Sequence, residues 1–380
     1  TFPFAGAGGV GRVTETLAAE LGRKGHSYLY LATRKRRAAE PVQEVQLFMP
    51  SNNIASAKNV ARLSSLVGER AVDAIINQAG IAPAVLDLLQ KSKLQIPILS
   101  VHHNCVACLQ EQHRSIVEHT LDRYRIPKIF RKELILQYLK GRSRRRTGVA
   151  FERIVREHER LVLLSERFKE EIDIYTTRVD KSRVIGIQNP APFKGDRSAM
   201  REKSNRVLFV GRLYNPQKRI DRLLEIWREV QAEFPTWGLD IVGEGPDRSL
   251  LESMSRRMGL KNAVFHGRQD PQPFYRRARV LLMPSDFEGY GMVLIEAQAF
   301  GCVPVAFDCF SAIGDVILDG ISGHIVRRGD VTQFTEVLRN MMREPERTSE
   351  FGIRGIEHCE RLSPAVIADQ WIGEILKASK

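Results

Sequence analysis

The sequence lacks any apolar run long enough to cross a membrane as a helix. Of its 380 residues, 43% are hydrophobic and 27% are charged, and no window approaches the roughly 18 uninterrupted apolar residues of a membrane span. Cysteine is scarce as well. Five cysteines are scattered along the chain, and Cys105 and Cys108 form a Cys-x-x-Cys without the second pair that completes a zinc site. The unpaired thiols indicate a reducing compartment, so we expect a cytoplasmic protein.

The chain also lacks an aromatic-rich basic platform, so nucleic acid is not expected as a partner, although the net charge is +13. The excess is local, because residues 122–146 contain ten Lys or Arg and two acids. Within this segment Phe130, Leu134 and Tyr138 share one helical face. Such a basic, apolar-striped helix suits an anionic membrane surface, reached from the inner face of the cell membrane. A core-packed helix with a solvated basic face explains the same pattern.

An acidic residue is missing where a dinucleotide fold needs one. Gly6, Gly8 and Gly11 fit G-x-G-x-x-G ahead of an amphipathic helix, a geometry that lets the backbone approach a phosphate. A NAD-binding fold then places an acid at the end of its second strand. Here the strand at 28–31 leads into the basic residues 34–36. NAD is therefore disfavoured, and an NADP-dependent oxidoreductase stays as a minor alternative.

Short apolar strands alternate with amphipathic helices through both halves of the chain, which predicts an α/β fold. The strands are expected at residues 28–31, 73–77, 96–101, 161–164, 184–189, 207–210, 239–242, 263–267, 280–283, 303–307 and 323–326. Residues 191–205 are rich in Pro, Gly and charge, and they predict a linker. Two doubly wound, Rossmann-like sheets facing a cleft follow, in domains spanning 1–190 and 206–363.

Charged side chains in the second half follow strands, where parallel sheets bind ligands. Arg212 and Lys218 flank one strand-to-helix connection and could converge on a diphosphate. Glu288 stands before a helix that begins near Met292, and Glu296 lies one turn inside it. The first N–H groups of a helix suit a phosphate, and a carboxylate accepts hydrogen bonds from sugar hydroxyls. Taken alone, the two glutamates are equally explained as solvated residues.

A pair of histidines follows a strand of the first half. His102 and His103 come directly after the apolar run at 96–101 and precede Asn104. The carboxyl end of a parallel strand is a ligand-binding position. A structural or solvent-facing histidine pair is the competing interpretation, and the residues alone do not decide between the two.

Together these motifs resemble the retaining GT-B glycosyltransferases of family 4, over nearly the whole chain. The matching segments are GGVGR (8–12), His103-Asn104, Asn189-Pro190, VGRL…QK (210–218), VGEGP (242–246), PSDFEGYGMVLIEA (284–297), GCVPV (301–305) and DGISGHIV (319–326). The family normally begins with a full strand before the glycine loop, and residues 1–4 look like the remnant of one, so we expect residues to precede Thr1.

The resemblance implies a nucleotide-diphospho-sugar donor and a set of residues that hold it. Arg212 and Lys218 would bind the diphosphate, Glu296 the ribose, and Glu288 the donor sugar. The implied donor-binding set is Gly8, Gly9, Arg212, Lys218, Glu288, Gly289, Tyr290, Gly291, Met292, Val293 and Glu296, and the implied catalytic set is His103, Glu288, Arg212 and Lys218. His103 is preferred to His102 near the transferred sugar, and residues 364–380 would form a helix that crosses back to the first domain.

The resemblance also implies a retaining transfer by front-face attack. No Asp-x-Asp stands in a strand-end context, so no essential metal or other cofactor is expected, and the Arg212–Lys218 pair would stabilise the leaving diphosphate instead. A UDP-sugar is favoured and GDP stays open. A glycan or lipid-linked acceptor in surface polysaccharide or lipopolysaccharide assembly is expected. The alternatives are a nucleotide-sugar epimerase of the same fold and a non-catalytic sugar-nucleotide or membrane-binding module.

Overall fold

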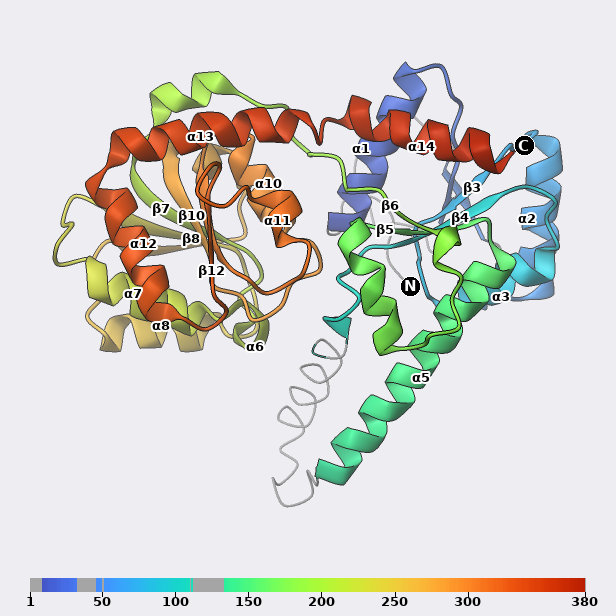
Figure 1. Ribbon diagram of the computed structural model, residues 1–380, viewed down its shortest axis with the longest axis horizontal. Helices are drawn as coiled ribbons and strands as arrows, with labels where there is room; N and C mark the ends of the chain where they lie inside the picture. Colours follow the sequence, from blue (N-terminus) through green and yellow to red (C-terminus); the bar gives the residue numbers. More distant parts are fainter. Residues whose placement is uncertain (1–8, 33–45, 50, 110, 112–132, 380) are drawn as a thin grey trace. The chain divides into compact units, whose positions relative to one another are not determined.

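The structure is a computed structural model that describes residues 9–32, 46–49, 51–109, 111 and 133–379. It is built of parallel sheets and helices (Figure 1). The chain divides into two compact units. The N-terminal unit comprises Thr1–Gln110, Pro127–Pro192 and Pro364–Lys380, and the C-terminal unit comprises Glu111–Ile126 and Phe193–Ser363.

A four-stranded parallel sheet forms the centre of the N-terminal unit. Its strands follow the order β3 (Ile75–Asn77), β4 (Ile98–His102), β5 (Arg160–Leu163) and β6 (Val184–Gly186). All five residues of β4 are buried, as expected for a strand covered on both faces. Strands β1 (Tyr30–Ala32) and β2 (Gln46–Phe48) pair separately. Helices α2 (Ala57–Glu69) and α3 (Pro83–Ser92) bury Leu63 against Leu88 and Leu89.

The basic segment continues into one long helix, α5 (Glu133–Glu157). The alternation of strands and helices would place a separate helix at about 150–159 after the basic residues, but the structure has no break there. No proline interrupts residues 133–157, and the far half is anchored because Phe151 and Ile154 are fully buried. Arg142, Arg144, Arg145 and Arg146 are exposed. The side chains of the predicted apolar stripe at 130, 134 and 138 lie outside the described part of the chain.

A six-stranded parallel sheet forms the centre of the C-terminal unit. The order is β12 (His324–Val326), β11 (Val303–Phe307), β10 (Ala278–Met283), β7 (Ser204–Val210), β8 (Gly238–Val242) and β9 (Ala263–Gly267). The strand order reverses direction between β7 and β10. An open parallel sheet binds ligands outside the carboxyl ends of its strands at such a switch point. The predicted α/β fold is confirmed.

The helices of this unit follow the predicted alternation. They are α6 (Asn215–Lys218), α7 (Ile220–Val230), α8 (Arg248–Arg257), α9 (Gln272–Arg277), α10 (Met292–Gln298), α11 (Ile313–Val316), α12 (Val331–Arg343) and α13 (Pro345–Glu360). On α7, Leu223, Leu224 and Trp227 are buried and form its apolar face.

The segment predicted as a linker has structure of its own. A short 3₁₀ helix, η5, spans Arg197–Glu202. Asp196 caps it, because its carboxylate accepts a hydrogen bond of 2.9 Å from the backbone N–H of Ser198. Arg276 of α9 forms ion pairs with Asp196 and Glu202. A 3₁₀ helix of six residues is too short to produce a hydrophobic period, which is why the sequence pattern does not reveal it.

The last helix, α14 (Pro364–Ala378), is part of the N-terminal unit and packs beside α1 (Gly9–Arg23) (Figure 1). Ile367, Ala368 and Trp371 are buried. Lys24, just after α1, forms an ion pair of 2.7 Å with Asp369. Among the described helices, none is both long and apolar enough to span a membrane.

Candidate active site

Two neighbouring connections carry most of the predicted site residues. One runs from the end of β7 through Arg212 to Lys218, and the other runs from the end of β10 to α10. Because β7 and β10 are adjacent and parallel, their carboxyl ends meet at the same edge of the sheet. The structure therefore brings together the charged residues that the sequence placed at separate strand ends.

Lys218 and Glu288 form a buried ion pair at this edge. Lys218 Nζ lies 2.6 Å from Glu288 Oε1, and the two side chains are only 13% and 7% exposed. A charge-assisted hydrogen bond of this length is stronger than one between neutral groups. The sequence assigned the lysine to a diphosphate and the glutamate to a sugar, and it missed that each is the partner of the other.

Arg212 is the exposed cation of the site. Its guanidinium carbon lies 5.5 Å from the centre of the Tyr214 ring, a distance at which a cation and an aromatic face attract. Within the part of the chain that the structure describes, Arg212 forms no ion pair. Its charge is thus oriented by an aromatic ring and is not neutralised by a described carboxylate, which suits an anion-binding role.

The two glycines of the VGEGP segment pack closely against the backbone of the loop that carries Arg212. A Cβ built on Gly243, whose φ is +148°, would lie 1.8 Å from the carbonyl oxygen of Gly211, and one on Gly245 would lie 2.2 Å from that of Leu213. Backbone hydrogen bonds join the same segments, since the N–H of Gly211 donates to Val242 and the N–H of Leu213 donates to Glu244. Only glycine permits this approach.

Glu296 lies one turn inside α10, as predicted, and is 6% exposed. Tyr275 of α9 donates its hydroxyl to Glu296 Oε2 at 2.8 Å. Tyr275 is fully buried, so the bond fixes the carboxylate from the protein side. Sequence reasoning missed Tyr275, because the two residues are 21 positions apart and only an aromatic residue before a strand signals it.

The glycine turn before α10 has the conformation that its sequence requires. Gly291 has a φ of +70°, and a Cβ there would come within 2.9 Å of Leu294. Tyr290 is buried, whereas Gly289, Met292 and Val293 are half-buried. Any contact between this turn and a ligand is thereby left mainly to the backbone. The donor-binding roles of these five residues stay predictions.

The N-terminal unit presents His103 at the end of β4. His103 Nε2 lies 2.5 Å from Gln78 Oε1, and burial lowers the pKa of His103 to about 3. His102 packs edge-on against Phe151, and burial lowers its pKa to about 4. His102 is buried, while His103 is half-buried. Both rings are therefore neutral at physiological pH, and the sequence missed Gln78 as the partner of His103.

The remaining predicted residues of this unit are the glycines near the chain start. Gly9 is the exposed first residue of α1, and Gly8 lies outside the described residues. Among the described residues, no group of three or more His, Cys, Asp or Glu side chains is placed to hold a metal ion. Metal independence stays a prediction. All five cysteines are buried, and none is joined to another by a disulfide.

The fold and its charged strand ends define a class of protein. The lipopolysaccharide outer core galactosyltransferase WaaB shares the fold with a TM-score of 0.68 at 20% sequence identity, over 98% of this chain and 97% of that chain. Anabaena HepE in complex with UDP gives a TM-score of 0.72 at 15% identity, over 98% of this chain and 97% of that chain. At these identities the likeness concerns the fold, which is that of a GT-B glycosyltransferase.

Two family models identify the chain within this class. The model for "Glycosyltransferase Family 4" matches residues 7–190, and the model for "Glycosyl transferases group 1" matches residues 204–344. The chain belongs to the family 4 glycosyltransferases, which confirms the family that its motifs indicate, whereas retention of configuration stays a prediction. The amylovoran biosynthesis glycosyltransferase AmsD of Erwinia amylovora is 29% identical over 221 residues, 56% of this chain and 61% of AmsD. The chain spans less than two thirds of the length of the first curated relatives that it matches.

Proposed function

We propose that the chain transfers a sugar, with retention of configuration, from a nucleotide-diphospho-sugar to a glycan or lipid-linked acceptor in bacterial surface polysaccharide or lipopolysaccharide assembly. The observation that carries the proposal is the buried Lys218–Glu288 pair at the switch point of the C-terminal sheet. Arg212 and Glu296 lie on the same two connections. This combination offers cations for a diphosphate and carboxylates for hydroxyls within one site.

Each site residue has a role in this proposal. Arg212 and Lys218 neutralise the charge that develops on the departing diphosphate. Glu288 accepts a hydrogen bond from the donor sugar, and Glu296, oriented by Tyr275, accepts hydrogen bonds from the ribose. The backbone of residues 289–293 holds the donor phosphate and sugar. The preplaced cations supply the electrostatic stabilisation, so the proposal requires no metal.

The bond changes follow from front-face attack. The bond between the anomeric carbon and the diphosphate oxygen breaks, and its electron pair leaves with the diphosphate. An acceptor hydroxyl oxygen bonds to the same face of the anomeric carbon, and its proton passes to the departing phosphate. His103, held neutral by its buried position and bonded to Gln78, would lie near the transferred sugar. Donor-binding roles for Gly8 and Gly9 are proposed on the family resemblance alone.

The proposed donor and acceptor classes are supported by what similar proteins bind or make, as well as by the chemistry of the site. HepE binds UDP in its solved complex, which supports a UDP-sugar for this chain. AmsD acts in amylovoran biosynthesis and WaaB is a lipopolysaccharide galactosyltransferase, which supports a polysaccharide or lipopolysaccharide acceptor. The four exposed arginines of α5 support attachment to an anionic membrane surface, where a lipid-linked acceptor would be held.

Product analysis tests the reaction. UDP- and GDP-sugars are incubated with and without glycan and lipid-linked acceptors, and the products are examined by mass spectrometry and anomeric NMR. The proposal predicts a glycoside that retains the donor's anomeric configuration and forms only with an acceptor. Glu288→Gln is expected to reduce the yield at least a hundredfold, whereas Glu229→Gln, which changes an exposed glutamate, leaves it unchanged. Free nucleotide with an isomerised sugar and no glycoside would establish the epimerase instead.

Liposome flotation tests the membrane surface. Vesicles with anionic lipid should bind the wild type. They should not bind the variant in which Arg142, Arg144, Arg145 and Arg146 are changed to Gln. The matched control changes four other exposed arginines, Arg201, Arg256, Arg257 and Arg354, and should still bind. Equal flotation of both variants would remove the role given to α5.

A further inference from the structure

Arg219, directly after Lys218, has an unusual backbone for an arginine. Its φ is +49° and its ψ is +50°, in the left-handed region. The residue follows the last residue of α6 and precedes the first residue of α7, so it alone connects the two helices. Glycine is the usual residue for such a connection, because a Cβ makes the conformation unfavourable. A non-glycine persists there only where its surroundings hold it in place.

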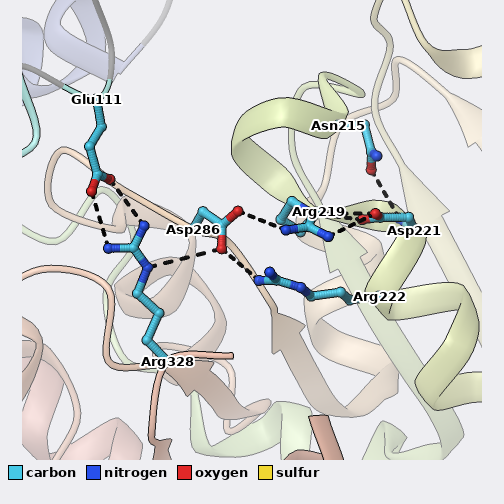
Figure 2. Close-up of polar contacts among 7 residues, drawn as sticks. All are labelled: Glu111, Asn215, Arg219, Asp221, Arg222, Asp286 and Arg328. Atoms are coloured by element: carbon cyan, nitrogen blue, oxygen red, sulfur yellow. Dashed lines mark hydrogen bonds and ion pairs between the residues drawn. The ribbon is translucent and has the colours of Figure 1, made fainter. Parts of the chain in front are cut away.

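Two carboxylates hold the Arg219 guanidinium. Its Nε and Nη2 donate to Asp221 at 3.0 and 2.9 Å, and its Nη1 donates to Asp286 at 2.9 Å (Figure 2). Asp221 is held in turn, because its backbone N–H donates to Asn215 Oδ1 at 2.9 Å. These hydrogen bonds hold Arg219 in its left-handed conformation. Burial lowers the pKa of Arg219, but the bonds to Asp221 and Asp286 outweigh burial and raise it. The arginine is therefore charged at every physiological pH.

Asp286 is the centre of the network in Figure 2. Besides Arg219, it accepts a hydrogen bond from Arg222 Nη1 at 2.6 Å, and Arg328 Nε lies 4.0 Å away. Arg328 is paired with Glu111 at 3.2 Å. Burial disfavours the charge on Asp286, but the bonds from Arg219 and Arg222 prevail and lower its pKa. The carboxylate is thus fixed from two sides and stays ionised.

The network joins the same two segments that carry Lys218 and Glu288. The backbone N–H of Asp286 donates to the carbonyl of Gln217 at 2.9 Å, and Gln217 Nε2 donates to the carbonyl of Phe287 at 3.3 Å. Contacts therefore lie on both sides of Lys218 in the chain and directly before Glu288. The pair cannot shift without disturbing bonds to its direct sequence neighbours.

We infer that Arg219 and Asp286 are positioning residues that hold Lys218 and Glu288 in the geometry required for the donor. The inference rests on the proposed function, because it assigns Lys218 to the diphosphate and Glu288 to the sugar. Arg219 and Asp286 act through Lys218 and Glu288, and the proposal gives them no contact with the diphosphate or the sugar. This account explains why an arginine occupies a left-handed position, since Arg219 both connects α6 to α7 and supplies one of the cations that orient Asp286.

Kinetics with the donor, together with thermal unfolding, separate positioning from simple stabilisation. The variants are Arg219→Gly, which relieves the backbone and removes the cation, and Asp286→Asn, which removes the charge at nearly constant shape. Both are expected to lower kcat/KM for the donor about tenfold to a hundredfold, mostly through kcat, because the sugar and diphosphate contacts lose alignment. The double variant should be no worse than the more impaired single variant, and Arg219→Lys should recover part of the activity.

The matched control is Asp240→Asn. Asp240 is as buried as a site carboxylate and pairs with Arg206 and His266 within the same unit, but it contacts none of the residues of this network. It should lower the melting temperature and leave kcat/KM unchanged. If Arg219→Gly and Asp286→Asn behave like this control, the network only stabilises the fold and the inference is wrong.

A second readout does not require turnover. The rate of acylation of Lys218 by an amine reagent is followed by mass spectrometry, with the exposed Lys261 as internal reference. In both variants Lys218 should react faster relative to Lys261, because its partner is no longer held. If the wild type transfers no sugar and Lys218 still becomes more reactive in the variants, the proposed function fails and the positioning stands. Unchanged Lys218 reactivity overturns the positioning, whatever the activity.

Discussion

The polar side chains at the strand ends are charged in the C-terminal unit and neutral in the N-terminal unit. In the C-terminal unit these groups are charged and paired, as in Lys218 with Glu288. In the N-terminal unit they are neutral and joined by hydrogen bonds, since Asn77, the last residue of β3, donates to Ser100 at 2.8 Å, and His103, directly after β4, lies 2.5 Å from Gln78 Oε1. The contrast matches the chemistry of the proposed substrates, because a diphosphate needs charges and an acceptor sugar needs neutral hydrogen-bonding groups.

The largest effect is expected where a charge of the C-terminal site loses its partner. Lys218→Ala leaves Glu288 buried without its cation, and we expect a loss of about 3 kcal/mol in the free energy of unfolding, together with at least a hundredfold loss of turnover. Urea unfolding and donor kinetics measure both. Lys218→Ala with Glu288→Ala should recover much of the stability and none of the activity, and a double variant as unstable as Lys218→Ala would contradict the pairing.

The next largest effect is expected when a glycine of the C-terminal unit is replaced by alanine and compared with a glycine of the N-terminal unit. Gly243→Ala forces a Cβ against the carbonyl of Gly211 at a positive φ, and we expect a loss of about 2–3 kcal/mol with weaker nucleotide binding. Gly68→Ala, in α2 of the N-terminal unit, meets nothing within 4 Å. It should be neutral or stabilising by about 0.5–1 kcal/mol. Equal effects at the two glycines would show that the close approach at Gly243 does not support the site.

The neutral state of the N-terminal unit predicts a pH dependence. Burial lowers the pKa values of His102 and His158 to about 4, below the unfolded value near 6.5. The unfolded chain therefore binds more protons between pH 6.5 and 4, and stability falls as the pH falls through this range. The slope should reach about 1.4 kcal/mol per pH unit for each histidine. His158→Gln should reduce this slope in urea titrations, and His26→Gln, which changes an exposed residue, should not.

The smallest effect concerns a single hydrogen bond of the C-terminal site. Tyr275→Phe removes the hydroxyl that donates to Glu296 and keeps the buried ring. Hydrogen bonds to charged groups contribute about 1.5–3 kcal/mol, so we expect roughly tenfold weaker UDP binding with little change in kcat. Tyr175→Phe, which removes a hydroxyl that donates to the carbonyl of Val106 in the other unit, is the control. Weaker UDP binding in the control alone would contradict the role of Tyr275.

The sequence predicted the sheet of the C-terminal unit closely, because strands such as β8, β10 and β11 are apolar runs that are almost wholly buried. Strands expected at 207–210, 280–283 and 303–307 lie within β7, β10 and β11. The position of Glu296 in α10 also followed from the chain, because a glycine at a positive φ precedes that helix. Local pattern was sufficient wherever one segment alone determines the structure.

Pairing between distant residues could not be predicted in the same way. Lys218 and Glu288 are 70 positions apart, and the chain has 58 Lys and Arg against 45 Asp and Glu, so any cation has many formal partners. Arg219 shows the same limit. Glycine is the residue expected at a left-handed position, so the sequence could not predict that an arginine adopts this conformation. The continuity of α5 was missed because the arginines at 142–146 separate the apolar positions 130–138 from the buried residues Phe151 and Ile154.

Calorimetric titration with UDP, GDP and NADPH tests the central claim, that the charged strand ends of the C-terminal unit bind a nucleotide diphosphate. Wild type, Arg212→Ala and the control Arg256→Ala, which changes an exposed arginine of α8, are compared. The account predicts that UDP binds to the wild type and the control, and that it binds about tenfold or more weakly to Arg212→Ala, a loss of roughly 1.4 kcal/mol. Preference for GDP with the same loss would change the base and keep the site. Binding of NADPH alone, or nucleotide binding that is unaffected by Arg212→Ala, would contradict the account.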